Sequence, residues 1–252
     1  MTSWYAAYRN EADKILQRKK YIVFLLIGAA ICILWAVLGN MLSDFIGQRI
    51  GILIMLMPTP MGVLPFFLQI VLPLLIFMGT TDLITAEGAE HTMKAMICRP
   101  VERWKLYTAK LLAVLTYTAI YLICVFAIST ILNQLFGRAL PSEELLTALA
   151  SYALTIPTLA VLTAFAALVS LFGRSSSLIM FLLVVMYLVM SILPVFIPIL
   201  SELLFTSYLG WYRLWIGVRP QASRLVHMLI IVLSYGVVFF MAGSLVFDRK
   251  EY

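Results

Sequence analysis

Six long apolar runs divide this chain, and each run is long enough to cross a lipid bilayer as a helix. A membrane-spanning helix needs about 20 consecutive apolar residues to cover the hydrocarbon core. Charged residues occur only near the ends of the runs, as is typical of membrane spans. The predicted spans are approximately residues 21–41, 64–84, 106–132, 145–172, 177–200 and 226–247.

The composition agrees with a polytopic membrane protein. Of the 252 residues, 63% are hydrophobic and only 12% are charged, and the mean hydropathy is +1.02, far above the values of soluble domains. The segments between the spans are too short to bury a separate soluble core. We therefore expect an all-α fold in which residues 1–252 form a single transmembrane domain.

The distribution of basic residues predicts the orientation, because short cytosolic segments of membrane proteins are enriched in Lys and Arg. If both termini are cytosolic, thirteen of the eighteen basic residues lie on the cytosolic side, namely Arg9, Lys14, Arg18, Lys19, Lys20, Lys94, Arg99, Arg103, Lys105, Lys110, Arg174, Arg249 and Lys250. The other side keeps five arginines and no lysine. The net charge of +6 therefore reflects topology and does not indicate nucleic-acid binding.

Residues 1–20 carry an apolar stripe at helical spacing, with polar residues on the other side. The stripe consists of Trp4, Ala7, Tyr8, Ala12, Ile15 and Leu16. Such a segment is predicted to form an amphipathic helix that lies at the cytosolic membrane surface and then turns into the first span. A solvated tail is the alternative.

The spans carry few ionisable groups, and this excludes several classes of function. Asp82 and Lys110 lie near cytosolic ends, where a long side chain can reach the interface. Proton- or ion-coupled transporters and intramembrane enzymes need paired ionisable or nucleophilic side chains inside the spans. The two histidines, His91 and His227, are isolated, so no metal site is expected. We expect no catalytic residue and no cofactor site in this chain.

An aromatic segment follows the fifth span, which we expect Pro194 and Pro198 to bend or end. Residues 201–224 are too polar to span the membrane but contain several large aromatic side chains. Two interpretations remain open: an interfacial or re-entrant anchor in the outer leaflet, or a gate over a substrate route. The candidate gate residues are Tyr208, Trp211, Tyr212 and Trp215.

The charged loop between the second and third spans has the pattern of a short amphipathic helix ended by Pro100. Its apolar side includes Met93 and Met96, and its polar side includes Glu87 and Glu90. A docking helix for a soluble partner and an ordinary solvated loop both fit this pattern.

The loop also resembles that of the permeases of the ABC type-2 exporter family. The similarity lies in Glu87-Gly88, Thr92, Arg99-Pro100-Val101-x-Arg103 and Lys110. It extends to the N-terminal amphipathic helix, the six-span layout, the aromatic segment after the fifth span and the short basic tail. Short outer segments make the chain look like small bacterial bacitracin, drug or peptide exporters. Thr85 stands where many relatives carry an acidic residue.

The resemblance implies a non-enzymatic permease in the bacterial cell membrane, with both termini cytosolic. A coupling helix at about residues 86–98 would dock on a separate ATPase, through Glu87, Gly88, Glu90, His91, Thr92, Met93, Met96, Arg99 and Arg103. The chain contains no GxxxxGK[ST] phosphate loop, so ATP and Mg²⁺ would bind to the partner. Two ATPase copies would assemble with two permease chains in the lipid bilayer, the second permease being another copy of this chain or a similar permease. The expected substrate is an amphiphilic peptide, antibiotic or lipid-like molecule.

A different class of function also fits the charged loop. The chain would then be an integral-membrane sensor, scaffold or channel subunit, and residues 85–105 would dock a signalling or assembly protein in the cytosol. The identity of the protein that binds the loop separates this reading from the exporter.

Overall fold

The structure is a computed structural model that describes residues 2–46, 59–89, 102–136, 141–197, 199–215 and 222–250. Within these ranges every regular element is a helix. In chain order the elements are α1 (Thr2–Gln17), α2 (Lys19–Ile46), α4 (Pro60–Phe66), η1 (Phe67–Val71), α5 (Leu72–Thr80), η2 (Thr81–Ala86), α6 (Glu87–Ala89), α8 (Arg103–Leu135), α9 (Ser142–Ser170), α10 (Ser176–Phe196), α11 (Leu200–Leu203), η3 (Phe205–Trp215) and α12 (Ala222–Arg249).

Six helical stretches are long and apolar enough to cross a membrane, as the sequence predicts. They are Lys19–Gly39, Pro60–Ala89, Arg103–Leu135, Ser142–Ser170, Ser176–Phe196 and Val226–Arg249. Several begin or end a few residues beyond the apolar runs, because local signals in the sequence set where a helix begins and ends. Thr59 provides such a signal at the second span, where its hydroxyl accepts a hydrogen bond from the Gly62 amide before Pro60 opens the helix.

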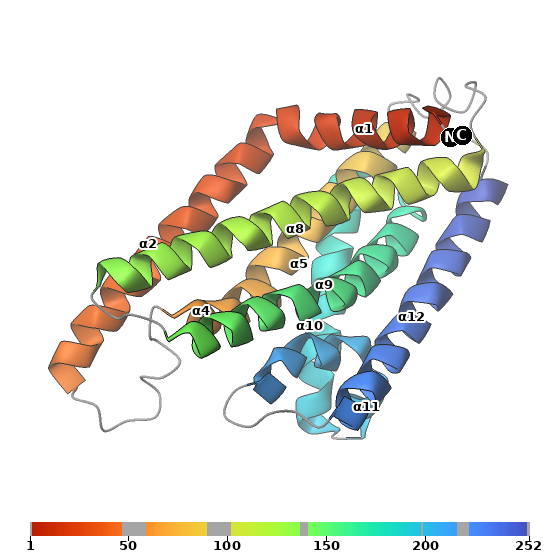
Figure 1. Cartoon of the computed structure of the whole chain (residues 1–252). Helices are drawn as coiled ribbons and strands as arrows, with labels where there is room; N and C mark the ends of the chain where they lie inside the picture. The colour runs from red at the N-terminus through yellow and green to blue at the C-terminus, as the bar shows by residue number, and fades with distance from the viewer. Residues whose placement is uncertain are drawn as a thin grey trace.

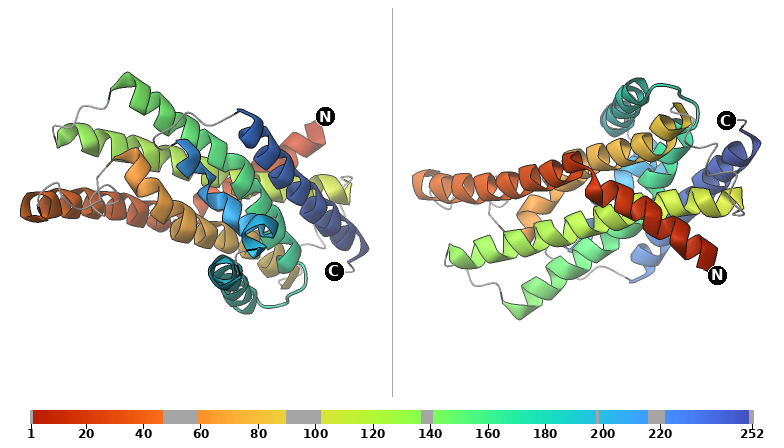
Figure 2. Two further views of the ribbon diagram at one scale, coloured as in Figure 1. Left: turned by 90° about the horizontal axis from the view of Figure 1, so that it is seen from below. Right: turned by 90° about the horizontal axis from the view of Figure 1, so that it is seen from above.

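The second span and α9 form the centre of the bundle, and α2, α10 and α12 lie at its periphery (Figure 1). Helix α1 does not continue the line of α2 but packs across one end of α8, as the view from above shows (Figure 2). Helix α1 and the C-terminal end of α12 both lie at that same end of the molecule (Figures 1 and 2). We call this the basic end, because Arg18-Lys19-Lys20, Arg103 and Arg249 belong to it.

The second span is one continuous helix with two π-helical turns, η1 and η2. In a π turn the amide bonds to the carbonyl five residues earlier, so the turn holds one more residue than an α turn. Where α5 meets η2, the hydroxyls of Thr80 and Thr81 donate to the carbonyls of Ile76 and Phe77, at 2.9 and 2.7 Å. Such back-bonding competes with the helical ladder and is compatible with the change in helix type.

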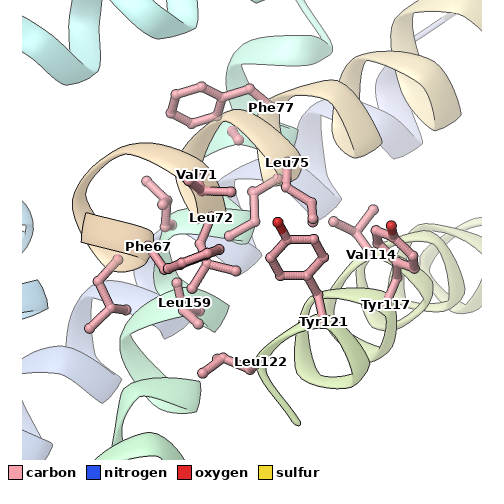
Figure 3. Packing of buried hydrophobic residues seen from close by; sticks show 14 of the residues in the cluster. Phe67, Val71, Leu72, Leu75, Phe77, Val114, Tyr117, Tyr121, Leu122 and Leu159 are labelled. Carbon is pink, nitrogen blue, oxygen red and sulfur yellow. The ribbon is translucent and has the colours of Figure 1, made fainter. Parts of the chain in front are cut away.

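The apolar core lies where the second span meets α8 and α9 (Figure 3). Leu72, Tyr121 and Leu159 are at most 1% exposed and come from these three elements. Helix α2 joins them through a close approach: a Cβ on Gly28 would lie 2.0 Å from the Tyr121 hydroxyl oxygen. A larger residue there would force the Tyr121 side chain to shift, and glycine at such a close approach is common where membrane helices pack tightly.

The prolines of the later spans have different effects on their helices. Helix α9 continues from Ser142 to Ser170 through Pro157, and its small side chains are largely buried, as is common where membrane helices pack closely. Helix α10 ends at Phe196, two residues after Pro194, which agrees with the expected end of the fifth span.

Candidate functional site at the basic end

Four charged side chains form a closed ring at the basic end. Lys110 Nζ lies 2.9 Å from Glu11 Oε2 and also pairs with Glu87 Oε2. Lys14 Nζ lies 2.7 Å from Glu11 Oε1 and 2.8 Å from Glu87 Oε1. Each carboxylate therefore binds both ammonium groups. We call these residues the charge ring.

Three of the four side chains in the charge ring are buried. The side chains of Lys110 and Glu11 are 1% exposed and that of Glu87 is 6% exposed, whereas that of Lys14 is 26% exposed. Removing such ions from water costs several kcal/mol per ion, and only good pairing offsets that penalty. Two positive and two negative groups balance here, and each carboxylate oxygen has an ammonium partner. The ring can hold its three elements, α1, α6 and α8, in one fixed arrangement.

The sequence of α1 explains why the ring forms. Tyr8, Glu11 and Ile15 recur at a spacing of three and four residues and therefore share one helix face. Ile15 is 1% exposed, and the Tyr8 hydroxyl lies 2.8 Å from Thr116 Oγ1 on α8. This face packs on the protein and brings Glu11 against Lys110. The predicted helix is present, but part of its stripe packs against α8, while Leu16 stays exposed.

A second ionic group surrounds Asp82. The Tyr21 hydroxyl donates to Asp82 Oδ2 at 2.6 Å, Arg18 Nη1 lies 3.4 Å away, and Lys20 also pairs with this carboxylate. The Tyr117 hydroxyl of α8 donates to the Tyr21 carbonyl at 2.7 Å. Asp82 therefore ties the start of α2 to the second span.

Asp82 and Lys110 correct a simple expectation from the sequence. Their positions near span ends suggest that they extend toward the membrane surface. Lys110 instead points into the chain and is 1% exposed, and Asp82 is 8% exposed. Both act as intramolecular ion-pair partners, because α1 and the start of α2 cover them.

Both ends of the charged loop are anchored. Before the loop, Glu87 belongs to the charge ring, and Thr85 Oγ1 donates to the Ser170 carbonyl of α9 at 2.9 Å. After the loop, Arg103 Nη1 donates to the Asp248 carbonyl of α12 at 2.6 Å. A force on the loop would therefore reach the second span, α8, α9, α12 and α1.

Three of the predicted partner-docking residues fall within the described chain: Glu87, Gly88 and Arg103. Glu87 and Arg103 bind within the chain, and Gly88 is half-buried at the start of the loop. The other six lie outside the described residues, namely Glu90, His91, Thr92, Met93, Met96 and Arg99.

The candidate gate residues lie at the other end of the bundle, in η3. Trp211 is 4% exposed, and the Tyr208 hydroxyl donates to the Glu202 carbonyl at 2.8 Å. Burial raises the pKa of Tyr208, and the neighbouring Tyr235 and Glu202 add to this shift. Tyr212 and Trp215 belong to the same helix, but their side chains lie outside the described residues.

The η3 segment packs against the bundle through aromatic contacts. The Phe205 ring lies 5.2 Å from the Phe165 ring of α9 and 5.5 Å from the Phe239 ring of α12, measured between centroids. Aromatic pairs at this separation add to the energy of apolar burial. The segment thus packs against α9 and α12, which suits an anchor or a closed gate.

In the part of the chain that the structure describes, no three His, Cys, Asp or Glu side chains lie close enough together to hold a metal ion. The polar residues of the basic end form ion pairs between helices. The arrangement is suited to holding helices and transmitting their movement.

Comparison with known proteins gives one family. The model of a family described as "Protein of unknown function (DUF2705)" matches residues 54–252, which include five of the six spans, the four gate candidates and the charged loop. No curated protein matches the chain.

Proposed function

The chain belongs to the DUF2705 family, and we propose that it is the membrane-spanning permease subunit of an ATP-driven exporter of the ABC type-2 class. It is not an enzyme by itself in this proposal. A separate cytosolic ATPase, present in two copies, binds ATP and Mg²⁺, and two permease chains form the transmembrane pathway. The substrate class is an amphiphilic peptide, antibiotic or lipid-like molecule.

The charge ring is the observation that carries this proposal. An ATPase that pulls on the charged loop can move the membrane-spanning helices only if the loop is fixed to them. Glu87 stands at the start of the loop and binds Lys110 on the third span and Lys14 on α1. Movement of the loop would displace these elements together, because separating a buried ion pair costs several kcal/mol.

This geometry gives Glu87 a positioning role. Its carboxylate binds two lysines of its own chain, so a partner would contact the residues that follow it. The docking surface in this proposal is Gly88 together with Glu90, His91, Thr92, Met93, Met96 and Arg99, while Glu87 and Arg103 hold the two ends of the loop.

The experiment that tests the function is purification of the assembly. A tagged full-length chain is expressed in its native host, extracted in mild detergent and analysed by mass spectrometry and by ATP hydrolysis. We expect an ATPase with a phosphate-binding loop to copurify at a 1:1 ratio, in a complex of two permease and two ATPase chains. Copurification of a kinase or another signalling protein, or of no ATPase, would instead favour the sensor, scaffold or channel interpretation.

Orientation has its own test, because the proposal puts both termini and the charged loop in the cytosol of a bacterial cell. Cys98 lies in the loop, outside the described residues, while Cys32 and Cys124 lie within spans. A membrane-impermeant maleimide is expected to miss Cys98 in intact cells and to label it in inverted vesicles. A Cys98→Ser variant controls for the other cysteines. Labelling of Cys98 in intact cells would reverse the orientation.

A further inference from the structure

An apolar pocket of about 370 Å³ lies between α8, α9 and α12. This volume is within the range of pockets that bind small apolar ligands, about 300–1,000 Å³. Leu233, Val237 and Met241 line the pocket from α12, and each is more than half exposed. The pocket therefore opens sideways, out of the bundle, beside the three helices whose arrangement Figure 1 shows.

Small residues create the pocket. Helices α9 and α12 contribute Pro157, Ala160 and Gly236 to its wall. A Cβ on Gly236 would lie 3.4 Å from Val161 Cγ2, which is ordinary van der Waals contact. Helix α12 thus approaches α9 closely, and no large side chain fills the space that remains beside α8.

The pocket lies at the depth of the hydrocarbon chains, in the leaflet at the basic end. Its α8 wall runs from Thr108 to Leu115, which spans about 10 Å at 1.5 Å per residue. Each leaflet contributes about 15 Å of the hydrocarbon core. Because α8 begins at Arg103, the wall starts about one turn inside the helix. An opening at this depth faces acyl chains, and water has few polar groups there to bind.

Basic and aromatic residues stand above the pocket at the membrane surface. Trp104 and Lys105 precede Thr108 by four and three residues, so they share its face of α8. The Lys105 ammonium lies 5.4 Å from the centre of the Trp104 ring. Tryptophan and lysine at the end of a span are typical of contact with lipid headgroups.

The same corner of the molecule carries surplus positive charge. Residues 102–105 and 248–250 contain four basic and two acidic side chains. Burial lowers the pKa of Lys250, and the positive charge of Arg174 lowers it further. An anion at this corner would reduce that repulsion, and the headgroup of an anionic phospholipid supplies one.

We propose that the pocket between α8, α9 and α12 binds one acyl chain of an anionic phospholipid from the leaflet at the basic end, with its headgroup at Lys105 and the end of α12. The lipid fills the gap beside Gly236 and bridges α8 to α12. This site does not depend on the exporter assignment, because it requires only that the chain lies in a bilayer.

Photo-crosslinking in liposomes tests the proposal. The full-length chain is reconstituted in phosphatidylcholine with a trace of phosphatidylglycerol that carries a diazirine on one acyl chain, and the labelled peptides are mapped by mass spectrometry. We expect labelling at residues 108–115, 160–164 and 233–241 to exceed labelling along the exposed face of α10. Unlabelled phosphatidylglycerol should compete, and the same amount of phosphatidylcholine should not.

Two variants and a matched control locate the site. Ala160→Phe fills the pocket and should abolish labelling there, whereas Ala153→Phe, at an exposed position of the same helix, should leave it unchanged. Lys105→Gln should reduce the preference for phosphatidylglycerol by about fivefold, the effect of one basic residue near an anionic surface. The labelling map of the wild-type chain decides the question even where Ala160→Phe fails to fold.

Two results would overturn the proposal. One is uniform labelling of all exposed helix faces, with equal competition by both lipids. The other is a contact with a second copy of this chain at Leu233 and Val237, seen as protein–protein crosslinks that replace the lipid label. In either case the pocket would not be a lipid site.

Discussion

The Lys110→Met variant is expected to be destabilised by about 3–5 kcal/mol, the usual effect of removing one partner from a buried ion pair. Methionine fills the space of the lysine stem but leaves Glu11 and Glu87 facing each other with Lys14 as their common partner. For a chain of this length, the loss corresponds to a fall in Tm of roughly 6–20 °C. Thermal unfolding of the purified protein in detergent, followed by intrinsic fluorescence, measures the effect.

A lysine on the same helix provides the control. Lys105 pairs with Glu102 at 2.9 Å, but these side chains are 33% and 60% exposed, so Lys105→Met should change the stability by less than about 1 kcal/mol. The double variant Glu11→Gln/Lys110→Met removes one charge of each sign and should recover part of the loss. Equal stability of Lys110→Met and wild type would mean that the ring does not hold the helices together.

The Gly88→Trp variant is expected to insert and fold normally but to lose export. Gly88 directly follows the charge ring at the start of the loop and is half-buried. A large side chain there would prevent close approach of the partner ATPase. We expect ATPase binding to weaken at least tenfold, which corresponds to about 1.4 kcal/mol. Pull-down of the ATPase, ATP hydrolysis and substrate transport are measured in parallel.

Gly210→Trp is the matched control for this prediction. Gly210 lies in η3 at the opposite end of the bundle, and a Cβ there would meet nothing within 4 Å. This variant carries the same added volume and should keep wild-type ATPase binding. Wild-type binding, hydrolysis and transport in Gly88→Trp would remove the loop from the coupling path and favour an ordinary solvated loop.

Hydropathy was sufficient to predict the six spans, because each span can be recognised from one apolar run that is long enough to cross the bilayer. The rest of the fold does not need to be known. The helix over residues 2–17 was also predictable from its periodicity. Its packing was not, because the stripe alone does not distinguish a lipid surface from a protein surface. Glu11 sits on the buried face and was not recognised, since its partner Lys110 is 99 residues away in the sequence.

The sequence did contain one signal for the charge ring. A lysine inside an apolar run is expensive to bury, so Lys110 needed either the membrane surface or a carboxylate. Glu87 was recognised through its place in the loop and assigned to an external partner. Only the structure brings Glu87 and Lys110 together, because the fold decides which of the two solutions the lysine adopts.

The π-helical turn at Thr81–Ala86 also affects how the chain tolerates a change of length. In an α-helix each residue advances the chain by about 100° around the axis, so deleting one residue turns every later side chain to another face. The π turn holds one extra residue. Losing one residue there would restore an α turn and leave Glu87 directed at Lys110, whereas the same deletion in α5 would break the charge ring. The turn is therefore a place in the second span where the insertion of one residue can be accommodated or reversed during evolution without loss of that contact.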